Sequence, residues 1–305
     1  MNRVLVTGAN GFFGRHLVSH LLERGYDVIA GARNKETLVK IFPKVISLNI
    51  LNQEEFQHIS YPVDVIIHAA AQRLGPEQDP HSIRSLFNTN VFGTLNVLHY
   101  ALALGIKKVI YCSSLCVYTL PQQLPISEEG RTSPLGNLDS YYGISKLTGE
   151  LLLEQIRCDK KLHVTSLRLG RIYGPGDNSG GLLTEWKSKA EQGETIDVYG
   201  NGERSLDFIY IEDVVEGIES ILKEEGMDGV MNLSSGVETT WKTLAQTFVE
   251  VFSRPERPSL LNYVSTGNKT RCYLDNSKIR KASGFIPRYS LKEGFLAWKE
   301  NLKKS

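Results

Sequence analysis

The sequence is poor in the features that mark several protein classes. Its 305 residues include four cysteines (Cys112, Cys116, Cys158 and Cys272), whose spacing fits neither a zinc site nor a disulfide framework. We therefore expect no metal and a protein of the reducing cytoplasm. The 35 basic and 34 acidic side chains nearly cancel, so net charge indicates no nucleic-acid partner. No apolar run is long enough to span a bilayer, and the chain enters a strand without a signal peptide, so no membrane partner is expected.

Segments with strand and helix patterns alternate over the first half of the chain. Helices are expected at Ser85–Leu104 and Tyr142–Arg157. The strands are expected at Arg3–Thr7, Asp27–Ala30, Val45–Asn49, Val63–His68, Lys108–Ser113 and His163–Leu169. Alternation of this kind is typical of a parallel sheet covered by helices on both faces. We therefore predict a doubly wound α/β fold.

A glycine-rich turn joins the first strand to a helical pattern. Gly8 can adopt a positive φ, Gly11 has no side chain to keep a phosphate away, and Gly14 allows close packing of helix on strand. The amino terminus of the helix then offers unpaired N–H groups to a pyrophosphate. This arrangement predicts a dinucleotide site, with contacts from Gly8, Asn10, Gly11, Phe12, Phe13 and Gly14.

The regular alternation fades after Tyr173. Short strands and helices then mix, near Thr195–Tyr199, Asp207–Tyr210, Glu212–Lys223, Val230–Leu233 and Thr240–Val251. We predict a dinucleotide-binding domain at residues 1–172 and a smaller mixed α/β substrate lobe at residues 173–305, with approximate boundaries and a chain that can cross between lobes. The cleft between them is the expected ligand site.

The end of the second strand favours NADP(H) over NAD(H), although NAD(H) stays possible. An acidic residue there would bind the ribose 2′-hydroxyl, whereas an arginine pairs with a 2′-phosphate. Here Arg33 follows Gly31-Ala32, with no carboxylate nearby; a solvated surface arginine is the alternative. Asn49 could contact adenine or simply shape a turn. Further cofactor contacts are expected from Ile50, Ala69, Ala70, Ala71 and Asn88, whereas His68 is expected to be packed rather than catalytic.

Tyr142 and Lys146 are four residues apart and so share one face of the second long helix. A lysine ammonium beside a tyrosine stabilises the phenolate and lowers the pKa of the phenol. The same ammonium could hold the ribose of the nicotinamide. Ser114, after the fifth strand, would donate to the substrate oxygen beside Tyr142. These three residues predict proton transfer at a carbonyl group.

Together these motifs resemble the extended short-chain dehydrogenase/reductases, in particular their nucleotide-sugar epimerase/dehydratase group. The similar segments continue through Arg168…Tyr173-Gly174-Pro175, Tyr199-Gly200-Asn201-Gly202, Asp207-Phe208, Asn232…Gly236 and Asp275…Pro287. The resemblance covers nearly the whole chain. It implies a Rossmann domain with a carboxyl-terminal substrate lobe, catalysis by Ser114, Tyr142 and Lys146, and often a homodimer formed through the two long helices.

Several positions depart from the pattern of that group. Leu115 and Cys116 replace the acidic pair of its dehydratases, so dehydration is not expected. Cys116 stands where some members carry a catalytic cysteine, but no second acid or base follows, so a packed thiol that borders the substrate is favoured. Arg171 replaces a common asparagine and Leu206 a diphosphate-binding arginine, which leaves Arg204 and Arg271 for that role.

The expected activity is NADP(H)-dependent reduction of a 4-keto-(6-deoxy) nucleotide sugar, with Tyr142 as proton donor. A nucleotide-sugar 4-epimerase that retains its NAD(P) is the main alternative, because both reactions use the same residues. Reduction of a small-molecule ketone is a third hypothesis, which Leu206 permits and the match at Asp275…Pro287 opposes. A non-catalytic dinucleotide-binding protein is disfavoured because Tyr142 and Lys146 are both present.

Overall fold

The computed structural model describes residues 3–75, 78–135, 139–159, 162–177, 181–224, 226–265, 267 and 269–302. Within these ranges a large parallel sheet of seven strands has the order β10-β6-β5-β4-β1-β2-β3. Its strands are β1 (Arg3–Thr7), β2 (Asp27–Ala32), β3 (Val45–Ser47), β4 (Val65–His68), β5 (Lys108–Cys112), β6 (His163–Leu169) and β10 (Gly229–Leu233). The predicted doubly wound α/β fold is confirmed.

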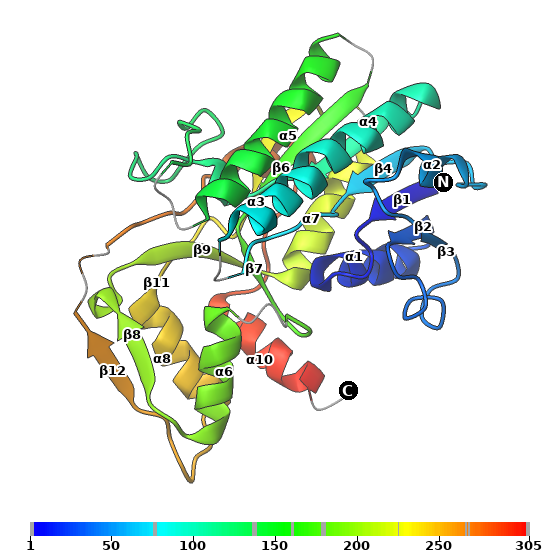
Figure 1. Ribbon diagram of the computed structural model, residues 1–305. Helices are drawn as coiled ribbons and strands as arrows, with labels where there is room; N and C mark the ends of the chain where they lie inside the picture. The colour runs from blue at the N-terminus through cyan, green and yellow to red at the C-terminus, as the bar shows by residue number, and fades with distance from the viewer. Residues whose placement is uncertain are drawn as a thin grey trace.

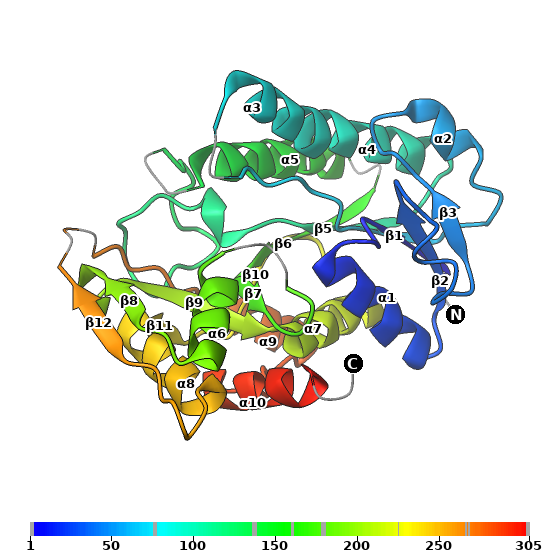
Figure 2. The ribbon, with the colours of Figure 1, turned by 60° about the horizontal axis from the view of Figure 1, so that its bottom comes forward.

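Helices cover both faces of this sheet (Figure 2). The helices on its faces are α1 (Phe12–Glu23), α2 (Gln53–Gln57), α3 (Pro80–Phe87), α4 (Gly93–Ala103), α5 (Ser140–Cys158), α7 (Ile211–Lys223) and α9 (Ser277–Ser283). The last described helix, α10 (Leu291–Leu302), packs instead against the smaller lobe. The side chains of β1 show which helices cover which face, because successive side chains of a strand point to opposite sides of the sheet. Val4 and Val6 pack in the core that contains α1 and α7, whereas Leu5 packs in the core that contains α4 and α5.

In the described part of the chain, the smaller lobe consists of two short sheets with helices packed against them (Figure 1). Its elements are β7 (Arg171–Tyr173), α6 (Leu182–Gln192), β8 (Ile196–Tyr199), β9 (Ser205–Tyr210), β11 (Glu238–Thr240), α8 (Trp241–Phe252) and β12 (Leu261–Val264). The chain then crosses back, because β10 pairs with β6 at the edge of the large sheet. The Val230–Leu233 strand therefore belongs to the first lobe in space, and the division at residue 172 stays a prediction.

The first long helix differs from its prediction at Ser85–Leu104. It begins five residues earlier, at Pro80, because the Asp79 carboxylate accepts hydrogen bonds from the backbone N–H groups of His81 and Ser82. It is also interrupted by a π-helical turn at Asn88–Phe92. An extra residue in such a turn shifts every later side chain around the helix axis.

Candidate active site

The large sheet reverses its winding direction between β1 and β4. The chain runs outward from β1 through β2 to β3 and then returns to β4 on the other side of β1. In open α/β sheets, ligands bind at the carboxyl ends of the strands at such a switch point. The glycine turn after β1 and the Ala69–Ala71 loop after β4 both end at this point.

The glycine turn is packed too tightly for side chains at two of its three glycines. A Cβ atom at Gly14 would lie 2.2 Å from the carbonyl oxygen of Gly8. Gly8 has a φ of 71°, and its Cβ would lie 2.7 Å from the Cα of Ala70. Gly11 is the N-cap of α1, and no side chain caps the helix there. The first N–H groups of α1 therefore stay available for a phosphate.

Alanine substitutions should separate the structural glycine from the ligand-facing one. Gly14→Ala is expected to lower the free energy of unfolding by about 1–3 kcal/mol, since the new methyl group meets rigid backbone. Gly11→Ala should cost less than about 1 kcal/mol, because alanine is only a poorer N-cap and its Cβ would lie 3.4 Å from the Gly8 oxygen, but it should weaken dinucleotide binding. Thermal unfolding and NADPH titration of both variants test this. Equal effects of the two substitutions on stability would contradict it.

A cavity of about 1840 Å³ extends from the glycine turn to the smaller lobe. It brings together most of the residues that the sequence analysis assigned to ligands, although their roles stay predictions. The predicted residues that line it are Gly8, Asn10, Gly11, Phe12, Phe13, Gly14, Arg33, Asn49, Ile50, Ala69, Ala70, Ala71, Ser114, Cys116, Tyr142, Arg171 and Arg204. The uncapped start of α1 and the missing side chains at the turn fit a dinucleotide at this end of the cavity.

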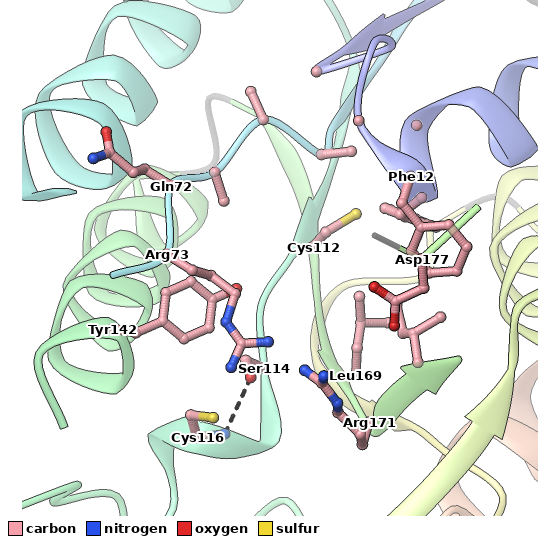
Figure 3. Close-up of a pocket in the computed structure, with 18 of the residues that line it drawn as sticks. Phe12, Gln72, Arg73, Cys112, Ser114, Cys116, Tyr142, Leu169, Arg171 and Asp177 are labelled. Carbon is pink, nitrogen blue, oxygen red and sulfur yellow. Dashed lines mark hydrogen bonds between the residues drawn. The ribbon is translucent and has the colours of Figure 1, made fainter. Parts of the chain in front are cut away.

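Ser114 lies two residues after the end of β5 and is the N-cap of a short 3₁₀ turn, Leu115–Val117. Its Oγ accepts a hydrogen bond of 3.2 Å from the backbone N–H of Cys116 (Figure 3). Because this contact uses the oxygen as acceptor, the hydroxyl hydrogen can be donated either to the Cys116 sulfur or to a ligand in the cavity. The site thus offers a hydrogen-bond donor where a substrate oxygen would lie.

Helix α5 approaches this turn closely enough to bring Tyr142 beside Ser114. A Cβ atom at Gly143 would lie only 2.2 Å from the carbonyl oxygen of Cys116, so glycine is required at that contact. Lys146, one helical turn later, is 1% exposed, and its Nζ lies 4.0 Å from the centre of the Tyr111 ring. Lys146 is therefore buried behind the cavity wall and, unlike Ser114 and Tyr142, does not line the cavity.

The predicted lowering of the Tyr142 pKa by Lys146 is not what the structure shows. Burial raises the pKa of Tyr142 above its ordinary value, and the Arg73 guanidinium opposes this effect. Arg73 lies over the tyrosine ring, 5.2 Å from its centre. Burial also lowers the pKa of Lys146 to about 8, while Cys112 and Glu150 act in the opposite direction. Desolvation thus outweighs charge pairing at both residues.

The lowered pKa of Lys146 predicts a pH dependence of stability. Between pH 8 and the ordinary pKa of 10.5, the unfolded chain binds the lysine proton more readily than the folded one. The contribution of Lys146 to the free energy of unfolding should therefore rise with pH in this window, by at most about 1.4 kcal/mol per pH unit. Urea denaturation of wild type and Lys146→Met at several pH values isolates this contribution. A difference between the two proteins that is constant with pH would contradict it.

A buried ion pair supports the turn that carries Ser114. Arg168 on β6 contacts Glu150 on α5, with a shortest distance of 2.7 Å, and the two side chains are 6% and 4% exposed. Burial alone would lower the pKa of Arg168, but its hydrogen bonds with Glu150 raise it overall. Ser113 donates a hydrogen bond to the same carboxylate. This network ties β5, β6 and α5 together directly beneath Ser114.

Buried side chains at His68 and Asn90 hold the loop after β4, and only the second was not selected by the sequence analysis. His68 is packed, as expected, between the hydroxyls of Thr7 and Thr94, and burial lowers its pKa to about 3. Asn88, a predicted cofactor contact, is exposed and lies outside the cavity lining. Asn90 is the buried asparagine; it hydrogen-bonds the backbone of Gln72 and the hydroxyl of Ser145. The π turn sets which of the two asparagines faces inward.

Two other predicted residues are placed differently from expectation. Arg271 is exposed, pairs with Glu238 at 2.6 Å and does not line the cavity, so the structure gives no support to its diphosphate role. Asn49 lines the cavity, but its side-chain oxygen accepts the Leu51 N–H, which is the turn-shaping arrangement. Arg204 does line the cavity; its guanidinium lies over the Trp241 ring, and its buried Nε has no partner in the described structure.

Arg73 is the main site residue that the sequence analysis missed. It follows β4 in the chain, lies over the Tyr142 ring, and is paired with Asp139. No local sequence pattern marks Arg73, because its partner is 66 residues away.

In the described ranges, no helix is long and apolar enough to cross a membrane, and no cluster of side chains could hold a metal. All four cysteines are free of disulfides.

Comparisons with known proteins agree with this site. A model of the NAD dependent epimerase/dehydratase family matches residues 4–248. A UDP-glucose 4-epimerase of Mycolicibacterium smegmatis is 26% identical over 96% of each chain. A dTDP-4-dehydro-6-deoxy-D-allose reductase of Streptomyces is 28% identical over 93% of this chain and 91% of its own. The crystal structure of a Thermotoga maritima UDP-glucose 4-epimerase with UDP-glucose superposes with a TM-score of 0.85, at 27% identity over 99% of each chain.

The fold and the site define an enzyme that uses a nicotinamide dinucleotide. The chain belongs to the NAD dependent epimerase/dehydratase family. The resemblance to the extended short-chain dehydrogenase/reductases, drawn from the motifs alone, is thereby confirmed.

Proposed function

We propose that this enzyme is an NADP(H)-dependent reductase that acts on the keto group of a 4-keto nucleotide sugar. The observation that carries the proposal is the placement of Ser114 and Tyr142 at one end of a cavity that starts at the glycine turn, with Lys146 buried one helical turn after Tyr142. The reductase and epimerase names among its relatives support a nucleotide sugar as substrate. The 6-deoxy part of the expected substrate stays a prediction.

In this proposal each residue acts on the carbonyl oxygen. The Ser114 hydroxyl donates a hydrogen bond to that oxygen, because the serine oxygen is already used by the Cys116 N–H. Tyr142 gives its proton to the same oxygen, and the Arg73 guanidinium over its ring stabilises the phenolate that is left. The reduced cofactor, when bound, supplies the hydride for the carbonyl carbon. Ketone, hydride and proton together give the alcohol.

The nucleotide end of the substrate would lie against the smaller lobe. Arg204 has a buried, unpartnered Nε and lies over Trp241, and both residues line the cavity. Unpartnered guanidinium N–H groups suit diphosphate oxygens. Arg204 could thus serve in place of the arginine that Leu206 replaces two residues later.

The decisive experiment follows the absorbance of NADPH in the presence of purified protein and a panel of 4-keto nucleotide sugars. Substrate-dependent, stoichiometric loss of NADPH is expected. The 4-epimerase is the second candidate, because an epimerase appears both among the curated relatives and among the similar solved structures. Conversion of a nucleotide sugar to its 4-epimer without net oxidation of NADPH would establish it instead.

The preference for NADPH should depend on Arg33. This side chain lines the cavity just after β2, is exposed, and makes no ion pair within the described ranges. Arg33→Ala should reduce the preference for NADPH over NADH by roughly tenfold, or about 1.4 kcal/mol, through loss of a contact with the 2′-phosphate. Lys40→Ala, an exposed change outside the cavity lining, is the control. An unchanged ratio of the two dissociation constants in Arg33→Ala would contradict the assignment.

We also propose a cytoplasmic homodimer that forms through α4 and α5. These helices lie side by side on one face of the sheet (Figure 2), and Phe92, Leu104 and Leu151, on or next to them, are 57%, 59% and 63% exposed. Light scattering of wild type and Leu151→Glu tests the dimer. A wild-type protein that is monomeric at high concentration would refute it.

A further inference from the structure

Asp139 occupies the N-cap position of helix α5 but does not cap the helix. Its φ of −111° and ψ of 42° lie outside the extended region, and in the described part of the chain its side chain makes no cap hydrogen bond with α5. Asp79, at the same position before α3, does accept such bonds, from the N–H groups of His81 and Ser82. An aspartate at the N-cap usually stabilises its helix through this contact. The Asp139 carboxylate is therefore directed elsewhere.

The partner of the Asp139 carboxylate is Arg73. The two side chains form an ion pair between the start of α5 and the loop after β4, and both line the cavity. Asp139 is 38% exposed and Arg73 is 45% exposed, so the pair contributes little to stability in water. A substrate in the cavity would exclude water from both side chains and strengthen their attraction.

This ion pair places a positive charge over the ring of Tyr142. The carbon at the centre of the Arg73 guanidinium lies 5.2 Å from the centre of that ring, and Figure 3 shows the two side chains next to one another. A cation over the face of an aromatic ring is attracted by its π electrons. The attraction is larger for a phenolate, which carries a full negative charge.

Lys146 is placed differently from Arg73. Its side chain is buried, does not line the cavity, and has its Nζ 4.0 Å from the centre of the Tyr111 ring. Burial lowers the pKa of Lys146, and the groups that oppose this effect are Cys112 and Glu150. The ammonium group is thus directed at β5 rather than at the cavity.

The groups that face the Tyr142 phenol come from several elements. Burial raises the pKa of Tyr142, and the next largest influence is the Arg73 guanidinium, which lowers it. The other groups in interaction with this phenol are two thiols, a second phenol and a carboxylate, namely Cys112, Cys116, Tyr111 and Asp139. Burial raises the pKa of both thiols and so keeps them neutral. Arg171, on the opposite side of the cavity, points toward Arg73 (Figure 3).

We propose that Asp139 is a positioning residue, which holds the Arg73 guanidinium over the ring of Tyr142. In this arrangement the guanidinium, rather than the Lys146 ammonium, stabilises the phenolate that remains after proton transfer. Asp139 acts only through Arg73, because its own negative charge opposes ionisation of the phenol. This inference rests on the proposed function, in which Tyr142 is the proton donor, and deepens it by assigning the groups that control the donor.

The test measures ionisation at position 142 and needs no turnover. A trifluorinated tyrosine, whose phenol ionises at a lower pH than that of tyrosine, replaces Tyr142, and fluorine NMR follows its titration in the folded protein. Arg73→Gln is expected to raise the titration midpoint by about one pH unit, a tenfold change in the ionisation constant. Lys146→Met should raise the midpoint by less.

A double-mutant comparison separates the holding of Arg73 from the charge of Asp139. Asp139→Ala should raise the midpoint when Arg73 is present, because the guanidinium is released from the ring. In the Arg73→Gln background the same change should lower the midpoint, because only a negative charge is lost. Asp79→Ala, at the N-cap of α3 and outside the cavity lining, is the control and should not shift the midpoint. Thermal unfolding confirms that each variant is folded.

The outcomes distinguish the inference from the function on which it rests. A larger rise in Lys146→Met than in Arg73→Gln overturns the inference. So does a midpoint that Asp139→Ala lowers in both backgrounds, since Asp139 would then act through its charge alone. If the nucleotide sugars are neither reduced nor epimerised, the proposed function fails, while the titrations still decide which cation controls the phenol.

Discussion

Tyr142→Phe is expected to reduce the turnover number by roughly a hundred- to ten-thousand-fold, while NADPH binds as tightly as it does to the wild type. The substitution removes only the phenolic hydroxyl, which is the proposed proton donor, and leaves the ring under the Arg73 guanidinium. Steady-state kinetics with the best substrate of the panel and an NADPH titration measure the two effects separately.

The neighbouring residue offers a matched control. Tyr141 is 40% exposed and does not line the cavity, so Tyr141→Phe should keep both activity and cofactor affinity. Equal losses in the two variants would show that the phenol of Tyr142 has no special role. A biological activity that survived Tyr142→Phe unchanged would favour a dinucleotide-binding protein without catalysis.

Glu150→Ala is expected to lower the free energy of unfolding by about 3–5 kcal/mol. The substitution leaves Arg168 buried without its carboxylate partner, and removal of one member of a buried ion pair has a cost of this size. It also removes the acceptor of the Ser113 hydroxyl, so the turn at Ser114 should lose support. Urea denaturation gives the change, and equal m-values for wild type and variant make the two free energies comparable.

Glu154→Ala, one helical turn further along α5, is the control. Its carboxylate is 43% exposed and pairs with Arg157, so its loss should change stability by less than about 1 kcal/mol. Replacement of both members of the buried pair, in Glu150→Leu with Arg168→Met, should destabilise less than Glu150→Ala alone. Similar stabilities of Glu150→Ala and Glu154→Ala would show that the buried pair does not support the fold.

The first lobe was largely predictable because its signals are local. A strand with a glycine turn and a helix occupies consecutive residues, and the periodicity of β1 and α1 is visible in the chain. The boundaries of β6 were predicted without error, whereas α3 begins earlier than expected because its Asp79 cap was overlooked. The position of β10 was less predictable, because its pairing with β6 joins segments more than sixty residues apart.

The same difference between local and long-range signals explains which residues of the candidate site were predicted. Residues in motifs, such as Gly14 and Tyr142, were found because spacing along one element fixes their relative positions. Asn88 was chosen instead of Asn90 because the π turn that rotates the helix has no clear sequence signal. Arg271 was assigned to a diphosphate from its residue type and from the family resemblance, and its pairing with Glu238 outside the cavity shows why these are not enough.

The sequence by itself determined the parallel α/β architecture and the glycine turn, and it singled out the tyrosine and lysine of the proposed catalytic set. These features depend on contacts within one element or between consecutive elements. Only the tertiary structure decided which charges surround Tyr142. Arg73, Asp139 and Arg171 come from three separate segments, and their convergence depends on how the strand ends and α5 pack. Burial, which fixes the direction of the Tyr142 and Lys146 pKa values, is likewise a property of the folded chain.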